Sequence, residues 1–266
     1  MIDHPIIRVQ HLVRTFGNVK AVDDVTFDVR KGETFAFLGP NGAGKTTTIK
    51  MLTTVLRPTS GTLELDGLNP VADSTEVRKR IGVVFQDPSL DNELTAWENI
   101  DIHGALYHVP RRVRRERAEA LLRLFELWER RDDLVKTFSG GMKRRLEIAR
   151  GFLHTPKVLF LDEPTLGLDP QSRNQMWTHV KNLNATEGVT VFLTTHYMDE
   201  ADRVADRIAI IDHGKIVATG SSAELKQQTG ADSLEGAFLA LTGNTIRDES
   251  ASAEDRVRQF VKVWRR

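Results

Sequence analysis

The sequence predicts an α/β fold in which a mostly parallel β-sheet core follows an antiparallel β subdomain and carries an inserted α-helical subdomain. Short apolar runs rich in β-branched and aromatic residues recur between residues 6 and 85 and again after residue 157, and such residues favour strands. Between about residues 87 and 150 the pattern is helical. A glycine-rich loop, residues 39–47, separates a predicted strand from a predicted helix. We expect one main domain over residues 1–220 and a short C-terminal extension over residues 221–266.

The first part of the chain is predicted to be β-rich. Residues 6–9, 25–29 and 34–38 are expected strands, and the last of them leads into the glycine-rich loop. Residues 46–52 are the expected helix after that loop. A turn at residues 58–61 precedes a strand at residues 62–65, and a buried strand at residues 81–85 ends at Gln86.

The helical insertion begins with a recognisable start signal. Thr95 and Glu98 have the spacing of a capping box, and Pro110 interrupts the helical pattern before an apolar face resumes. After the insertion, residues 158–161 and 189–193 are almost continuously apolar, as strands buried on both faces require. Residues 207–217 are predicted to form a hairpin, residues 234–241 a short helix and residues 243–253 a polar linker.

Composition excludes several classes of function. The chain has 266 residues, a formal net charge of zero and no cysteine, so disulfides, thiolate metal sites and cysteine nucleophiles are excluded. Zero net charge gives no general attraction to nucleic acid or anionic lipid. No apolar run approaches the roughly 18 residues that a bilayer-spanning helix needs. If the protein works at a membrane, another chain is expected to hold it there.

The glycine-rich loop carries the clearest chemical signal. It fits the pattern G-x-x-x-x-G-K-[ST] between a strand and a helix, which is the context that a phosphate-binding loop requires. Backbone N–H groups of such a loop surround a β-phosphate. Lys45 is expected to reach the β- and γ-phosphates, and the Thr46 hydroxyl to ligate magnesium. The predicted nucleotide-binding residues here are Gly39, Pro40, Asn41, Gly42, Ala43, Gly44, Lys45, Thr46 and Thr47.

Two further motifs fit the same chemistry. Asp162 and Glu163 end a buried apolar strand, where adjacent carboxylates are costly unless they meet a cation or a proton to be moved. Ser139, Gly140 and Gly141 precede residues spaced as one helix face, so they lie at a helix N-terminus, which attracts anions. Both motifs therefore indicate groups that handle phosphate or its metal ion.

Taken in order, these motifs together with Gln86, Gly167, Leu168, Asp169 and His196 resemble the ATP-binding subunit of an ABC transporter over roughly residues 6–220. The resemblance implies a P-loop NTPase core, ATP and magnesium as ligands, and ATPase activity. It implies Glu163 as general base, His196 as the γ-phosphate switch, and Gln86 as a residue sensing magnesium and the attacking water. Asp162 would hold the magnesium, and Phe16 would stack on adenine, although a phenylalanine in an early strand is equally often a core residue.

The resemblance also implies partners. Ser139, Gly140, Gly141 and Asp169 would act across an ATP-sandwich dimer, most simply a homodimer. Phe138 and Met142 depart from the commonest leucine and glutamine, and Met142 removes a polar contact that relatives can make. A separate polytopic permease would hold the protein peripherally at the cytoplasmic face of the membrane. Residues 85–95, 195–202 and 234–243 resemble the daunorubicin-resistance exporter branch, which moves drugs, lipids or glycans outward.

Alternative functions remain open from the sequence. They are an importer ATPase, a soluble ABC-type ATPase acting on ribosomes or DNA, and a nucleotide-binding module without turnover. Against nucleic acid, the basic run at residues 111–117 lacks interleaved aromatics and fits a solvated helix face. A basic stretch at residues 256–266, with Phe260 and Trp264 at helical spacing, either contacts lipid or the partner or is a neutral tail.

Overall fold

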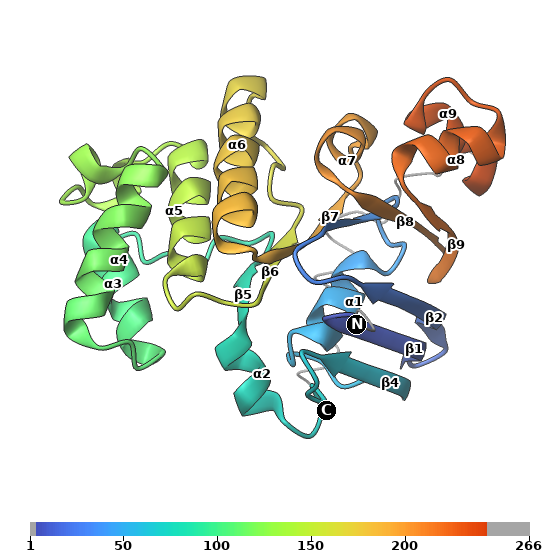
Figure 1. The fold of residues 1–266 in the computed structure, drawn as a ribbon, viewed down its shortest axis with the longest axis horizontal. Coiled ribbons are helices and arrows are strands. Elements are labelled where there is room, and N and C mark those ends of the chain that lie inside the picture. Colours follow the sequence, from blue (N-terminus) through green and yellow to red (C-terminus); the bar gives the residue numbers. More distant parts are fainter. Residues whose placement is uncertain (1–3, 244–266) are drawn as a thin grey trace.

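Six strands form the central sheet of the computed structural model, which describes residues 4–243 (Figure 1). The order across the sheet is β5-β6-β7-β3-β8-β9. The pairs among the first five strands are parallel, and only the edge strand β9 runs antiparallel, to β8. The bounds are β3 Thr34–Leu38, β5 Ile81–Val84, β6 Val158–Asp162, β7 Thr190–Thr195, β8 Arg207–Asp212 and β9 Lys215–Gly220. The β8–β9 pair confirms the predicted hairpin.

A second sheet is antiparallel and has the order β2-β1-β4. Its strands are β1 Ile7–Phe16, β2 Val19–Val29 and β4 Ser60–Leu65, and Figure 1 shows them in blue and teal at one end of the molecule. Phe27 of β2 lies against Phe35, Phe37 and Phe192 of the central sheet, with ring centroids 5.3–5.9 Å apart. This aromatic layer joins the two sheets, and it confirms the predicted antiparallel β subdomain.

The other end of the molecule is helical (Figure 1, green). Its elements are α3 Ala96–Leu106, α4 Arg111–Leu124, the 3₁₀ turns η1 Trp128–Arg130 and η2 Val135–Thr137, and α5 Gly140–Phe152. Thr95 and Glu98 form the predicted capping box, and Pro110 stands between α3 and α4. The insertion is therefore helical as predicted, while the division into residues 1–220 and 221–266 stays a prediction.

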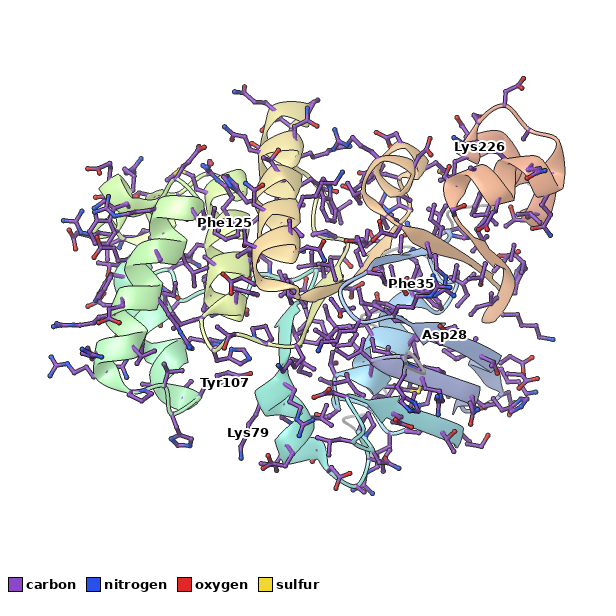
Figure 2. All side chains as sticks on the ribbon, in the orientation of Figure 1. Asp28, Phe35, Lys79, Tyr107, Phe125 and Lys226 are labelled. Atoms are coloured by element: carbon purple, nitrogen blue, oxygen red, sulfur yellow. The ribbon has the colours of Figure 1, made fainter. Side chains whose placement is uncertain are left out.

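Helices close the remaining surfaces of the central sheet. They are α1 Lys45–Leu52, α2 Ser74–Arg80, α6 Pro170–Glu187, α7 Met198–Val204, α8 Ser222–Thr229 and α9 Leu234–Thr242. α9 packs against α7, α8 and β9, so the start of the C-terminal extension is attached to the core. Figure 2 labels one residue from each hydrophobic cluster, namely Phe35 between the sheets and Phe125 among the helices.

The basic run at residues 111–117 is less solvated than expected. Arg114 of α4 is only 14% exposed and binds both oxygens of Asp101, and Arg117 donates to the carbonyl of Leu153. Arg111, Arg112 and Arg115 are exposed, as the predicted solvated face requires, whereas Arg114 and Arg117 fix α4 to its neighbours. The linker at residues 244–253 and the basic stretch at residues 256–266 lie outside the described residues. No helix within residues 4–243 is long and apolar enough to cross a membrane.

Candidate functional site

Four of the predicted site segments follow the carboxyl ends of parallel strands. β3 leads into the glycine-rich loop, β5 into Gln86, β6 into Glu163 and β7 into His196. Leu38 pairs with Thr195, and Asp162 pairs with Thr194, so these strand ends are level with one another. Because the carboxyl ends of parallel strands meet at one edge of a sheet, the topology gathers residues that are up to 157 positions apart in the chain, from Gly39 to His196.

The glycine-rich loop depends on two close backbone approaches. Gly44 has φ 106°, and a Cβ there would lie 2.4 Å from the carbonyl oxygen of Ala21. A Cβ on Gly39 would lie 2.4 Å from the carbonyl oxygen of Ile211. Only glycine fits at both positions, and helix α1 begins directly after the loop with Lys45.

Lys45 is buried, and all of its donors have acceptors. Its Nζ donates to the carbonyl oxygens of Gly39 and Pro40 at 2.8 and 3.1 Å, and lies 3.1 Å from Oε1 of Glu163. An ammonium has three N–H donors, so these three acceptors satisfy it. Burial lowers the pKa of Lys45, and the neighbouring Glu163 carboxylate opposes that shift.

Thr46 and Asp162 offer oxygen ligands at one point. The Thr46 hydroxyl donates to Oδ1 of Asp162 at 3.2 Å, and the Thr194 hydroxyl donates to the same oxygen at 2.6 Å. Mg²⁺ prefers oxygen ligands at about 2.1 Å, so two oxygens 3.2 Å apart can share one ion. The donor set therefore fits magnesium, with phosphate oxygens and water completing the shell. Gln86 is exposed just beyond β5, on the same edge of the sheet.

Glu163 connects the lysine to the histidine. Its Oε1 faces Lys45, and its Oε2 lies 3.0 Å from Nδ1 of His196. Its backbone N–H donates to the carbonyl and hydroxyl oxygens of Thr194, and its φ is 46°. The left-handed backbone departs from strand alternation, which otherwise sends neighbouring side chains to opposite faces. Asp162 and Glu163 can therefore serve one site.

The Ser139 motif forms a more exposed part of the surface. Ser139 caps α5, with its hydroxyl accepting from Met142 N at 3.2 Å, and Gly140 and Gly141 form the first turn. A Cβ on Gly141 would lie 2.8 Å from the Ser172 hydroxyl, which in turn donates to Asp169 at 2.6 Å. The structure thus brings the serine–glycine motif and Asp169 together through Ser172.

Phe16 ends β1 and is 46% exposed, which rules out the alternative that it is a core residue. The Arg14 guanidinium carbon lies 4.4 Å from the Phe16 ring centroid and covers one face of the ring. A cation over an aromatic ring is attractive. The exposed ring suits the predicted stacking role, which stays a prediction.

Sequence reasoning missed several residues that organise the site. Thr194 contacts both Asp162 and Glu163, and only its place at the end of a buried strand could have indicated it. Glu200 is buried and accepts hydrogen bonds from Thr165, Trp177 and Thr195, the residue before His196. Arg144 and Glu147 form a buried ion pair inside α5. Their spacing of three residues was the one available signal, and it is common on any helix.

Comparisons with known proteins identify the family. A family model described as ABC transporter matches residues 22–166. The chain is 48% identical over 228 residues to the daunorubicin/doxorubicin resistance ATP-binding protein DrrA of Streptomyces peucetius, covering 86% of this chain and 69% of the relative. It is 42% identical to a Nod factor export ATP-binding protein I of Ralstonia nicotianae, covering 87% of this chain and 72% of the relative.

Solved structures of ATP-binding cassettes share the fold of this chain. An ATP-binding subunit of an ABC transporter superposes with a TM-score of 0.82 at 30% identity, covering 90% of this chain and all of that one. A dimeric ATP-binding cassette in a post-hydrolysis state, bound to ADP and phosphate, superposes with a TM-score of 0.72 at 27% identity. That match covers 81% of this chain and 98% of the other.

Proposed function

The chain belongs to the ABC transporter family of ATP-hydrolysing subunits, and from this premise we propose that it works as an ATP-sandwich homodimer energising export through a separate membrane permease. The observation that carries the proposal is the placement of Glu163 between Lys45 and His196, beside the Thr46–Asp162 pair. ATP is the nucleotide, and magnesium is the metal ion that the oxygen ligands fit.

The hydrolytic step follows from these contacts. The phosphate oxygens of ATP displace one acceptor of Lys45, which then lies against the β- and γ-phosphates. Thr46 and Asp162 would hold magnesium, with Gln86 nearby, and the ion would supply positive charge against the phosphates. Glu163 accepts a proton from the attacking water, and His196 contacts the γ-phosphate and holds the Glu163 carboxylate. The products are ADP and phosphate.

The second half of each site is proposed to come from the partner. Ser139 and Gly140 are exposed at a helix N-terminus, whose first N–H groups have no partner within the helix. These groups suit a γ-phosphate held by the other subunit. The dimeric relative bound to ADP and phosphate supports this arrangement. Asp169, through Ser172, would transmit contacts across the same interface.

The names of the relatives support export as the direction of transport. One is named for resistance to daunorubicin and doxorubicin, and the other for Nod factor export. A drug, lipid or glycan cargo is consistent with both names. The permease would bind the cargo and hold this subunit at the cytoplasmic face of the membrane.

Subunit mixing tests the sandwich. Lys45→Ala removes the cation of one half-site, and Gly140→Asp places a negative charge where the partner's γ-phosphate is expected. A Cβ at Gly140 meets nothing closer than Leu168 at 4.0 Å, so this variant should fold. Each variant alone should release little phosphate. An equimolar mixture should form ATP-induced heterodimers with one intact composite site in half of randomly paired C₂ dimers, which sets an upper limit of about a quarter of wild-type activity. No ATP-induced heterodimer in the mixture, or full activity of Gly140→Asp alone, would contradict the arrangement.

A mild-detergent pull-down from native membranes tests the transport function. Recovery of a polytopic membrane protein lacking its own phosphate-binding loop is the expected result. Recovery only with ribosomes or DNA, in the soluble fraction, would overturn the transport proposal while leaving the ATPase chemistry intact.

A further inference from the structure

Arg144 lies on α5, five residues after Ser139, and its side chain is 8% exposed. Its Nε donates to the carbonyl oxygen of Pro164 at 2.8 Å, and Nη2 donates to those of Asp162 and Glu163 at 3.1 and 3.4 Å. Three successive carbonyl groups of the segment that carries both functional carboxylates therefore bind one guanidinium. No other side chain in residues 4–243 donates hydrogen bonds to all three.

The same guanidinium also reaches the segment that contains Gln86. Nη1 donates to the carbonyl oxygen of Phe85 at 2.6 Å and to Oε2 of Glu147 at 3.0 Å. A guanidinium has five N–H donors in a fixed plane, and Arg144 has five acceptors. Its geometry is therefore fully determined, and a shift of α5 must move these carbonyl groups or break hydrogen bonds.

Glu147 extends this connection by one turn of α5. It is 3% exposed, and its Oε1 accepts from the backbone N–H of Ser89 at 2.7 Å. Arg150, three residues further, donates to the carbonyl oxygen of Ser89 at 2.9 Å. Gln86 thus lies in a short segment that α5 holds at residues 85 and 89.

We infer that Arg144 is a positioning residue that links the Ser139 end of α5, facing the partner's nucleotide, to Glu163 and Gln86 of its own site. The inference rests on the proposed sandwich dimer. α5 is a continuous helix from Gly140 to Phe152, so a movement of its first turn is carried to Arg144. When the partner's γ-phosphate draws Ser139 inward, Arg144 moves the carbonyl groups that set the position of Glu163. Each site then becomes competent in response to occupancy of the other.

Arg144→Lys tests the link while keeping the charge. Lysine has three donors and no planar fork, so it cannot hold five acceptors in one geometry. Misplacement of a catalytic group by about 1 Å can cost 100-fold, so we expect kcat to fall about 10- to 100-fold. Binding of a fluorescent ATP analogue to the same purified protein should change less than about twofold, and the Hill coefficient for ATP should fall towards one.

Arg145→Lys is the matched control on the same helix. Arg145 binds the carbonyl oxygen of Phe125 at 3.1 Å and Glu126 at 3.3 Å, away from the catalytic segment. It should leave kcat and the Hill coefficient within about twofold of wild type, in line with a partly exposed surface pair. Equal loss in both variants would reduce Arg144 to a structural residue and overturn the inference, as would an unchanged kcat in Arg144→Lys.

A double variant separates stability from positioning. Arg144→Met leaves Glu147 buried and unpaired, which is strongly destabilising, whereas Arg144→Met with Glu147→Met replaces the pair by apolar volume and often restores stability. We expect the double variant to recover only part of the urea midpoint, because the carbonyl groups that Arg144 bound stay without a donor, and not to recover kcat. Recovery of both would overturn the inference. If Lys45→Ala and Glu163→Gln leave turnover intact, the proposed function itself fails, independently of Arg144.

Discussion

The two halves of the proposed nucleotide site are built in opposite ways. The half around Lys45, Asp162 and Glu163 consists of buried side chains, in which Lys45 pairs with Glu163 and Asp162 accepts hydrogen bonds from threonine hydroxyls. The half around Ser139 and Gly140 is exposed and presents a helix terminus. Groups that polarise water and hold metal must be held in place before the reaction, so they lie in the core of one chain. Groups that detect a partner's nucleotide must stay accessible, so they lie on the surface.

The largest expected effect tests the buried half directly. Glu163→Gln keeps the hydrogen-bonding shape but cannot accept a proton, so turnover should fall at least about 100-fold. ATP should still bind, since Lys45 then faces an amide in place of a carboxylate that competes with the phosphates. Phosphate release and binding of a fluorescent ATP analogue measure the two outcomes. Near-normal turnover would show that Glu163 is not the general base. It would also remove the reason for calling the buried half the catalytic half.

Replacing a glycine should destabilise the fold much more in the buried half of the site than in the exposed half. Gly44→Ala forces φ 106° on an alanine and places its Cβ 2.4 Å from a backbone oxygen, so we expect a loss of about 2–4 kcal/mol in the free energy of unfolding. Gly140→Ala has open space and a helical position, so the change should stay within about 0.5 kcal/mol or favour the fold. Urea unfolding measures both. Equal losses would show that both glycines serve only the fold.

Thr194→Val tests whether the Thr194 hydroxyl orients Asp162 in the buried half. The valine removes the hydroxyl that donates to Asp162 and accepts from Glu163 N. A hydrogen bond to a charged group contributes about 1.5–3 kcal/mol, so the free energy of unfolding should fall by about that amount. The magnesium concentration that gives half-maximal activity should rise, because Asp162 loses its orientation. Thr178→Val, on an exposed part of α6, is the control and should change neither quantity.

The smallest expected change in stability lies in the exposed half. Ser139→Gly should cost only a few tenths of a kcal/mol in helix stability, since glycine is an acceptable N-cap. The same variant removes the hydroxyl proposed to meet the partner's γ-phosphate, so ATP-induced dimerisation should weaken more than the fold does. Size-exclusion chromatography with ATP on a Glu163→Gln background measures this. Unchanged dimerisation would mean that the backbone N–H groups act alone.

The sequence predicted that Gln86, Glu163 and His196 follow strands, and the structure places each of them after the carboxyl end of a parallel strand, while their roles stay predictions. The sequence was less informative about geometry. Strands β1 and β2 extend well beyond residues 6–9 and 25–29, since register shifts after Val9 and a left-handed His11 break the alternation that identifies strands. Helix α6 was not predicted, although Met176, Trp177, Val180 and Leu183 form its buried face. Amides and hydroxyls between them weaken that pattern.

The contacts of Arg144 are the clearest example of what could not be predicted from the sequence. A sequence records that an arginine follows a helix start, but its hydrogen bonds are to backbone carbonyl groups of residues 85 and 162–164. Backbone acceptors are the same at every position, so no pattern of side chains identifies them. Only the three-dimensional arrangement shows that one guanidinium joins these segments.

The left-handed backbone of Glu163 has a consequence for protein engineering. A non-glycine residue at φ 46° costs about 1 kcal/mol or more, and glycine would relieve that cost. A redesign that optimised only thermal stability would therefore favour glycine at this position and yield a more stable protein without its proposed general base. The glutamate proposed as general base therefore occupies a conformation that the backbone disfavours, at a cost in stability.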